Sequence, residues 1–270
     1  MPKYLIADFI VEIEPKFDYL KKLSEPFLYE GDRSADFSAI PSDSYLNSLL
    51  RRMVEGSTID EAEEFATASI FNRKIIHRGA MLVHSSALVF YGKAYLFSAD
   101  SGVGKSTHTK MWLKRFGSKA HILNDDKPVV KIKNEVPLCC GTPFDGGSGI
   151  ANNETVPVGA IIFIERSDDN FVTIPDTNEI VQRLYKSTVK FVNKSDGMSL
   201  LSNLDNLIRH TKFYVLHCNT DECAVDVASN NIIKNCTEKT VCSRRPSCYM
   251  YKIDYLISLI QPSGASILPI

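Results

Sequence analysis

One stretch of the sequence combines small residues, a lysine and hydroxyl side chains at a spacing that suits phosphate binding. It covers residues 99–107 and has the sequence ADSGVGKST. The pattern Gly-x4-Gly-Lys-Ser/Thr binds nucleotide phosphates because small residues let successive backbone N–H groups turn toward one anion, and the following helix points its positive end at the same place. Ala99 replaces the first glycine, and alanine is small enough to keep the turn where its φ is negative.

This loop predicts a binding site for ATP and Mg²⁺. We expect Lys105 to reach the β- and γ-phosphates and the Ser106 hydroxyl to bind Mg²⁺. The loop lies between an apolar run at 94–98, expected to be a strand, and a helical pattern at 107–116, which is the context the motif requires. The alternative interpretation is an ordinary glycine-rich turn before a helix. The residues expected to contact the nucleotide are Ser101, Gly102, Val103, Gly104, Lys105, Ser106 and Thr107.

Two adjacent aspartates, Asp125 and Asp126, follow a short apolar run at 121–123 that we expect to be a strand. Phosphoryl transfer needs positioning, a metal and cancellation of charge on the phosphates. One carboxylate can hold Mg²⁺ or its waters, and the other can accept the proton of an acceptor hydroxyl. The sequence does not divide these two roles between them. The alternative is an Asx-type turn between two strands, because Asn-Asp clusters commonly form turns.

Residues 83–126 resemble the C-terminal catalytic domain of HPr kinase/phosphorylase, a bacterial protein-serine kinase whose P-loop domain is related to phosphoenolpyruvate carboxykinase. The sequence at 100–106 looks like the loop of that family, which favours Ser-Gly-x-Gly-Lys-Ser. His84 lies twenty-one positions before Lys105, where the family keeps a histidine on the strand preceding the loop. The aspartates at 125–126 fall near the family's paired aspartates.

The resemblance implies both a fold and a reaction. The fold is a P-loop nucleotide-binding domain with a mixed β-sheet flanked by helices, and the reaction is ATP-dependent phosphorylation of serine. In that family one aspartate of the pair is taken as the proton acceptor. The implied catalytic residues are Lys105, His84, Asp125 and Asp126, and the expected metal ligands are Ser106, Asp125 and Asp126. The resembling kinases assemble into rings, so the resemblance also implies a homo-oligomer.

Two features of the sequence depart from this pattern. Residues 124–128 and 141–144 are more similar still to a group of uncharacterised HPr-kinase-like proteins, in which the loop here at 141–147 often contains a tryptophan and a lysine. In this chain Phe144 stands for the aromatic residue, and no lysine follows before Val156. The Glu-Ile-Arg-Gly signature of the kinase family is not recognisable either. The missing lysine weakens the expectation that this loop stabilises the transferring phosphoryl group, and the missing signature argues against an enzyme. The alternative interpretation of the turn-forming residues 141–147 is a surface loop.

Strand-like and helix-like patterns alternate along the chain, which predicts an α/β layer structure. We expect strands at 129–132, 136–139, 158–164 and 213–218, and helices at about 177–188 and 198–209. Gly92-Lys93 predicts a two-residue hairpin turn with glycine at its first position. Residues 1–75 predict a small α+β region without recognisable chemistry, and residues 76–270 predict the P-loop kinase-like domain. The alternative is that the two form one continuous domain.

The charge and the cysteines exclude several classes of protein. With 31 basic and 32 acidic residues the net charge is −1, which argues against a broad basic face for nucleic acid or anionic lipid. No apolar run approaches the ~20 residues that span a bilayer, and the N-terminus does not resemble a signal peptide. The seven cysteines include no Cys-x2-Cys pair, so we expect reduced packing thiols in a cytoplasmic protein. Those in the C-terminal third are Cys218, Cys223, Cys236, Cys242 and Cys248.

Three functions remain open at this point. The first is an ATP- and Mg²⁺-dependent kinase that phosphorylates a hydroxyl, serine of a peptide or protein above all. The second is a small-molecule kinase or carboxykinase-like enzyme, although a carboxykinase would need further cationic groups and usually a longer chain. The third is a non-catalytic nucleotide-binding sensor or scaffold. The sequence does not identify the acceptor; by elimination, residues 1–75 and the tail after Cys236 are the expected recognition surfaces.

Overall fold

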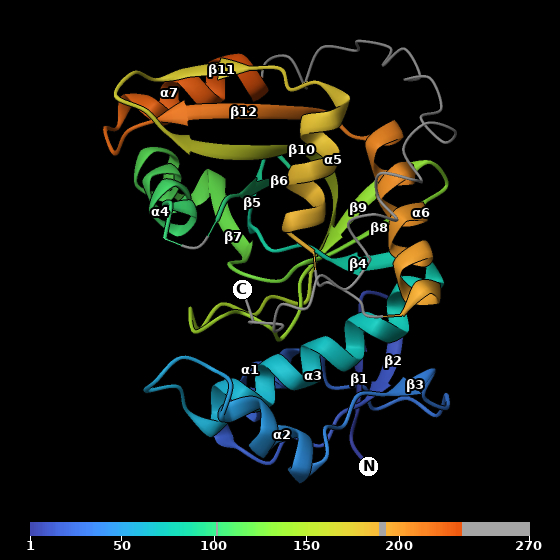
Figure 1. Ribbon diagram of the computed structural model, residues 1–270. Helices are drawn as coiled ribbons and strands as arrows, with labels where there is room; N and C mark the ends of the chain where they lie inside the picture. The colour runs from blue at the N-terminus through green and yellow to red at the C-terminus, as the bar shows by residue number, and fades with distance from the viewer. Residues whose placement is uncertain (101, 189–192, 234–270) are drawn as a thin grey trace.

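The computed structural model describes residues 1–100, 102–188 and 193–233, which form a mixed α/β structure (Figure 1). The strands are β1 (Lys3–Ile6), β2 (Phe9–Glu12), β3 (Phe37–Ser38), β4 (Ala80–Leu82), β5 (Ser86–Phe90), β6 (Lys93–Ser98), β7 (Ala120–Asn124), β8 (Val129–Lys133), β9 (Val136–Cys140), β10 (Thr155–Arg166), β11 (Phe171–Thr173) and β12 (Phe213–Cys218). The helices are α1 (Asp18–Ser24), α2 (Asp43–Leu50), α3 (Ile59–Ile75), α4 (Lys105–Phe116), α5 (Thr177–Lys186), α6 (Lys194–His210) and α7 (Cys223–Ala228). The predicted α/β class is confirmed. Within the described ranges, no helix has both the length and the apolar character needed to cross a bilayer.

The larger sheet brings the carboxyl ends of several strands to one edge. Its order is β4-β8-β9-β10-β6-β5-β7, with β12 paired to β10 and β11 paired to β12. Strand β10 pairs in parallel with β6 and β12, while β5 is antiparallel to both β6 and β7. Strands β6, β7, β10 and β12 therefore run in the same direction. The segment after β6, residues 99–104, is called the phosphate loop below, and it shares this edge with residues 125–127 after β7.

Alternate residues of the central strands face two separate cores, as the two-residue period of a strand requires. Leu96 of β6 belongs to a core with Ile180 of α5 and Leu204 of α6. Its neighbour Phe97 belongs to the opposite core, together with Trp112 of α4. Figure 1 accordingly shows α4 and α7 on one side of the sheet and α5 and α6 on the other. The phosphate loop thus connects the end of β6 to α4, on the face of the sheet that α4 covers.

The hairpin between β5 and β6 turns one residue earlier than predicted. Phe90 pairs with Lys93, so the turn consists of Tyr91 and Gly92. Both have positive φ, 49° and 70°, as the favoured two-residue hairpin turn with two left-handed positions requires. Glycine therefore occupies the second position of the turn rather than the first. Strand β6 nevertheless ends at Ser98, where the sequence predicts it.

Residues 1–75 form β1–β3 and α1–α3, which gather on one side of the larger sheet (Figure 1). The predicted boundary at residue 75 coincides with the end of α3. Phe71 of α3 lies in a hydrophobic core that also contains Leu82 of β4 and Phe144 from the loop after β9. Apolar packing is therefore continuous across the predicted boundary.

Replacing Phe71 by alanine is expected to lower the free energy of unfolding by about 3–5 kcal/mol. The fully buried ring contacts Phe37 on one side and Phe144 on the other, so its loss opens a cavity between the N-terminal region and the larger sheet. Urea unfolding followed by far-UV circular dichroism and by the fluorescence of Trp112, the single tryptophan, measures the change.

A matched substitution, Phe171→Ala, removes a partly exposed ring from β11 and should cost less than about 1 kcal/mol. We expect circular dichroism and fluorescence to report the same transition in Phe71→Ala. A separate early transition, seen only by circular dichroism and without a change at Trp112, would contradict the shared core.

Candidate functional site

The phosphate loop takes a backbone shape that its glycines allow. Gly102 and Gly104 have φ of +75° and +124°, a region that residues with a Cβ rarely adopt. Gly104 is the residue before α4, so the free N–H groups and the positive end of that helix face the loop. Ser101, which the sequence predicts to contact the nucleotide, lies outside the described residues.

Lys105, the first residue of α4, is folded back over this loop. Its Nζ donates a hydrogen bond to the carbonyl of Ala99 at 3.0 Å, and the residue is only 9% exposed. Burial lowers the pKa of Lys105, while the negative charges of Asp126, Asp125 and Asp100 act in the opposite direction. The lysine and both predicted aspartates therefore lie close enough to interact.

The other loop residues lie at the first turn of α4 and against the end of β10. Ser106 is partly buried and Thr107 is exposed. Arg166, the last residue of β10, donates from Nε to the carbonyl of Val103 at 3.3 Å and also hydrogen-bonds the carbonyl of Gly102. This side chain, which the sequence analysis did not single out, fixes the loop to the neighbouring parallel strand.

Asp125 is tied to α4 through two buried hydroxyl groups. Its Oδ1 accepts a hydrogen bond from Ser86 of β5, and Ser86 Oγ lies 3.0 Å from Oγ1 of Thr109. Thr109 Oγ1 in turn lies 3.2 Å from the carbonyl of Ser106, to which it donates. Asp125, Ser86 and Thr109 are all buried. These contacts connect one predicted metal ligand, Asp125, with another, Ser106.

Asp126 lies between a histidine and a lysine. His84 Nε2 is 3.1 Å from Oδ1 of Asp126, and Lys127 Nζ donates to Oδ2. Burial by itself raises the pKa of Asp126, but the hydrogen bond from His84 and the charge of Lys127 outweigh it and hold the pKa well below its usual range. The backbone of His84 is fixed as well, since its N–H donates to Ser187 at 2.7 Å. Asp126 is therefore a carboxylate throughout the neutral range.

Asn124 forms the turn that carries both aspartates. Its side-chain oxygen accepts the backbone N–H groups of Asp126 and Lys127 at 3.0 and 2.7 Å, which is an Asx-type turn. Its Nδ2 donates to the carbonyl of Phe144 at 3.0 Å. The turn proposed as the alternative interpretation is thus present, but Asn124 makes it. The carboxylates of Asp125 and Asp126 remain directed to other groups.

The loop after β9 is less exposed than its composition indicates. Residues 141–145 are buried, so the alternative interpretation of 141–147 as a surface loop is wrong for five of its seven residues. Phe144 packs in the core, and the buried carboxylate of Asp145 accepts the N–H of Ile150 at 3.0 Å and the hydroxyl of Tyr19 at 2.6 Å. Gly146 lies so close to Asp126 that an added Cβ would be 2.6 Å from its Cγ. The loop therefore forms a wall against Asp126.

The oxygen atoms near the phosphate loop fit the predicted Mg²⁺ site. Mg²⁺ is usually held by one or two carboxylates together with phosphate oxygens and waters. Ser106 begins α4, and the carboxylates of Asp125 and Asp126 both act on Lys105. In the described part of the chain, no group of three or more His, Cys, Asp or Glu side chains is placed so that it could hold a metal ion by itself.

The cysteines lie away from these groups or outside the described residues. Cys139, Cys140 and Cys218 are buried free thiols, and Cys223 is an exposed one. Burial raises the pKa of Cys139, Cys140 and Cys218, so these side chains are neutral at neutral pH. The three buried thiols fit the predicted role in packing, whereas the exposed Cys223 does not. The other three cysteines, Cys236, Cys242 and Cys248, are outside the described residues.

A cavity of about 650 Å³ opens beside the phosphate loop. Its walls are the loop itself, the end of β10, helix α5 and His84. Arg183 in the wall pairs with Glu165 and Glu179. The complete set of acidic and basic wall residues is Asp100, Glu165, Arg166, Glu179, Arg183 and Lys186. His84 both lines the cavity and contacts Asp126, so it separates the cavity from the carboxylate pair, which is not among the residues that line it.

Comparison with known proteins identifies no family for this chain. No protein-family model matches its sequence, and no curated protein matches it either. Among solved structures, the HPr(Ser) kinase/phosphatase from Coxiella burnetii is similar over 57% of this chain and 92% of that chain, with 11% sequence identity and a TM-score of 0.35. A likeness at this level carries no argument about function.

Among the residues that sequence reasoning missed, three are charged and contact the predicted site or a direct neighbour of it. Lys127 directly follows the aspartates, so its position in the sequence was a usable signal. Arg166 ends an apolar strand, where a charged side chain marks the sheet edge, but nothing local connects it with the phosphate loop. Glu64 belongs to α3 in the N-terminal region, yet its Oε1 lies 3.4 Å from Lys127 Nζ. No local pattern could have found it.

Proposed function

We propose that this chain is an ATP- and Mg²⁺-dependent kinase that transfers the γ-phosphoryl group to a hydroxyl, with serine of a peptide or protein as the expected acceptor. The proposal rests on one observation: three groups lie together at one edge of the larger sheet. These are a glycine loop before a helix, a buried lysine folded over that loop, and two aspartates directly after β7. A P-loop nucleotide-binding fold is part of the same proposal.

The residues of the chain divide the work of phosphoryl transfer between them. Backbone N–H groups of the loop and the start of α4 bind phosphate oxygens, and Lys105 neutralises charge at the β- and γ-phosphates. Ser106 with Asp125 and Asp126 would hold Mg²⁺, which when bound offsets charge on the phosphates. The low pKa of Asp126 suits a carboxylate that stays charged and makes it a poor proton acceptor.

The cavity beside the loop offers a route for the acceptor. A hydroxyl entering between α5 and the phosphate loop would meet the γ-phosphate from the face of the sheet opposite α4. Its oxygen bonds to the γ-phosphorus while the bond from that phosphorus to the bridging oxygen of ADP breaks. The hydroxyl proton passes to a carboxylate of the pair. His84, in the wall and against Asp126, orients Asp126, the carboxylate that stays charged.

Two other functions have an observation in their favour. The cavity volume of about 650 Å³ lies within the range of small-molecule sites, which favours a small hydroxyl compound as acceptor. A non-catalytic nucleotide sensor or scaffold is favoured by the missing Glu-Ile-Arg-Gly signature and by the absence of a lysine from residues 141–156. A small-molecule kinase would differ from the proposal only in its acceptor, whereas a sensor or scaffold would transfer no phosphoryl group.

The deciding experiment incubates the purified full chain with γ-³²P-labelled ATP and MgCl₂. The acceptors are a library of serine-containing peptides and a panel of small hydroxyl compounds, and Lys105→Ala is the reference for background. We expect label on a serine peptide above that background. Label found only on a small compound would mean that the acceptor is a small molecule and not a peptide. ATP binding without any transfer would support the non-catalytic sensor or scaffold. A wild-type chain that fails to bind ATP would overturn the proposal as a whole.

A further inference from the structure

We infer that Glu64 of α3 is a positioning residue for this site, which holds the Asp126 carboxylate through Lys127 and Gly146. The inference rests on the proposed function, since it concerns one of the two carboxylates assigned there. It also gives the N-terminal region, which carries no recognisable motif, a direct contact with the candidate site.

The contacts of Glu64 converge on one oxygen atom. Its side chain is 5% exposed, and Oε1 accepts a hydrogen bond from Lys127 Nζ at 3.4 Å and one from the backbone N–H of Gly146 at 3.3 Å. A buried carboxylate is costly unless it is paired and hydrogen-bonded, and these two donors supply both requirements. Lys127 and Gly146 come from different loops, so Glu64 joins those loops to α3.

Both partners of Glu64 also contact Asp126. The Lys127 ammonium bonds to Oδ2 of Asp126, and Gly146 lies directly against its Cγ. On the third side, His84 Nε2 contacts Oδ1. The orientation of Asp126 is therefore set by three neighbours, two of which Glu64 holds in place.

Glu64 also limits how strongly Lys127 cancels the charge of Asp126. The ammonium lies between two carboxylates and is shared by them. If Glu64 is made neutral, Lys127 pairs with Asp126 alone and withdraws negative charge from the site that must hold Mg²⁺. Loss of a residue that supports a metal ligand typically costs 10–100-fold in metal affinity or activity.

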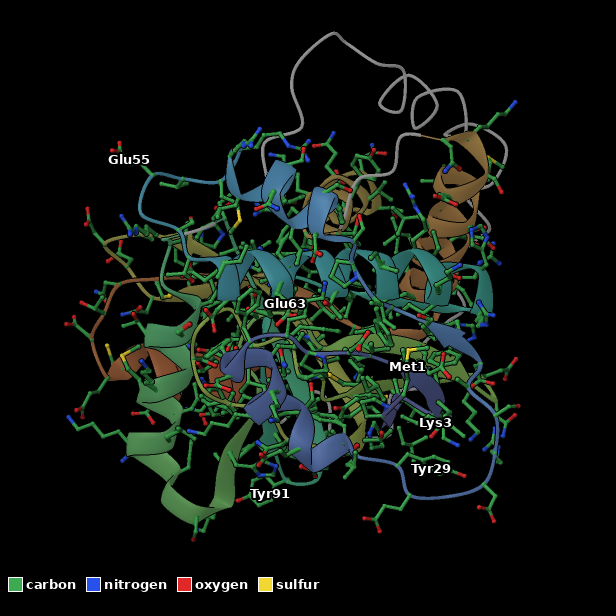
Figure 2. All side chains as sticks on the ribbon, turned by 90° about the horizontal axis from the view of Figure 1, so that it is seen from below. Met1, Lys3, Tyr29, Glu55, Glu63 and Tyr91 are labelled. Atoms are coloured by element: carbon green, nitrogen blue, oxygen red, sulfur yellow. The ribbon has the colours of Figure 1, made fainter. Side chains whose placement is uncertain are left out.

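A purely structural salt bridge would also destabilise the protein when broken, so stability alone does not test the inference. Glu63 provides the matched control, and Figure 2 labels it on the same helix. It is equally buried, but it accepts the backbone N–H groups of Lys16 and Phe17 at the start of α1. Glu63→Gln makes the same chemical change without touching Lys127.

The experiment measures binding of a non-hydrolysable ATP analogue by calorimetry with and without Mg²⁺, and the turnover of ATP. We expect Glu64→Gln to reduce the Mg²⁺-dependent gain in affinity and kcat by about tenfold or more, with affinity in the absence of Mg²⁺ changed less than about twofold. Glu63→Gln should leave both quantities within about twofold of wild type. Equal effects in the two variants would overturn the inference.

A second comparison tests whether Glu64 acts through Lys127. The effect of Glu64→Gln is measured again in a Lys127→Met background, where we expect it to shrink to less than about twofold, because groups acting through one another are not additive. A full effect in that background would contradict the inference. If wild type itself binds no nucleotide, the proposed function fails and the inference falls with it. If wild type binds but Glu64→Gln behaves as Glu63→Gln does, the inference alone fails.

Discussion

Replacing Lys105 by alanine is expected to lower kcat by about 10²–10³-fold, the range found when one preorganised charge-stabilising group is removed. The same change should weaken ATP binding. The physical reason lies in the burial of the ammonium over the phosphate loop, where its hydrogen bond to Ala99 and the charges of the nearby aspartates hold it. In a site that excludes water, a positive charge acts more strongly on phosphate oxygens than it does in solvent.

Lys110→Ala is the matched control for this prediction. Lys110 lies on the same helix α4 but is exposed, so its loss should change kcat and the Kd of ATP by less than about twofold. Calorimetry with ATP and the labelled transfer assay give the two values. Wild-type binding and turnover in Lys105→Ala would show that residues 99–107 form an ordinary turn before a helix.

The second large effect is expected at the paired aspartates. Asp125→Asn and Asp126→Asn should each reduce kcat by about 10²-fold or more, while nucleotide affinity without Mg²⁺ stays near wild type. Asparagine has almost the same shape as aspartate and can keep the hydrogen bonds from Ser86 and His84. It lacks the negative charge needed to hold a metal or accept a proton.

The two variants should also differ from each other. Asp126 is held charged by His84 and Lys127, so we expect its loss to appear mainly in the Mg²⁺ dependence of turnover. Loss of Asp125 should lower turnover at saturating Mg²⁺ as well. Asp32→Asn, in an exposed N-terminal loop, is the control. Wild-type kcat in both aspartate variants would mean that residues 124–127 serve only as a turn.

The sequence was sufficient wherever the relevant residues are consecutive. The glycine turn before α4 and the turn at 124–127 depend on the conformations of neighbouring backbone units and on short side chains that bond to them. These interactions span a few positions, so residue type and spacing carry the information. Helix α4 itself begins at Lys105, two residues before the predicted start at Thr107. The hairpin at Tyr91–Gly92 shows the limit of this reasoning, because its register depends on cross-strand pairing and shifted by one residue.

The sequence alone therefore indicated the glycine turn between β6 and α4, with the lysine and hydroxyl groups that follow it, and the α/β class. The tertiary structure alone decided which distant groups act on them. Glu64 contacts Lys127, which lies sixty-three positions later in the sequence, and Phe144 packs in the same core as Phe71. Such contacts follow from how α3 and the sheet bury their apolar faces together, and burial is a property of the whole packed chain. No local pattern records it.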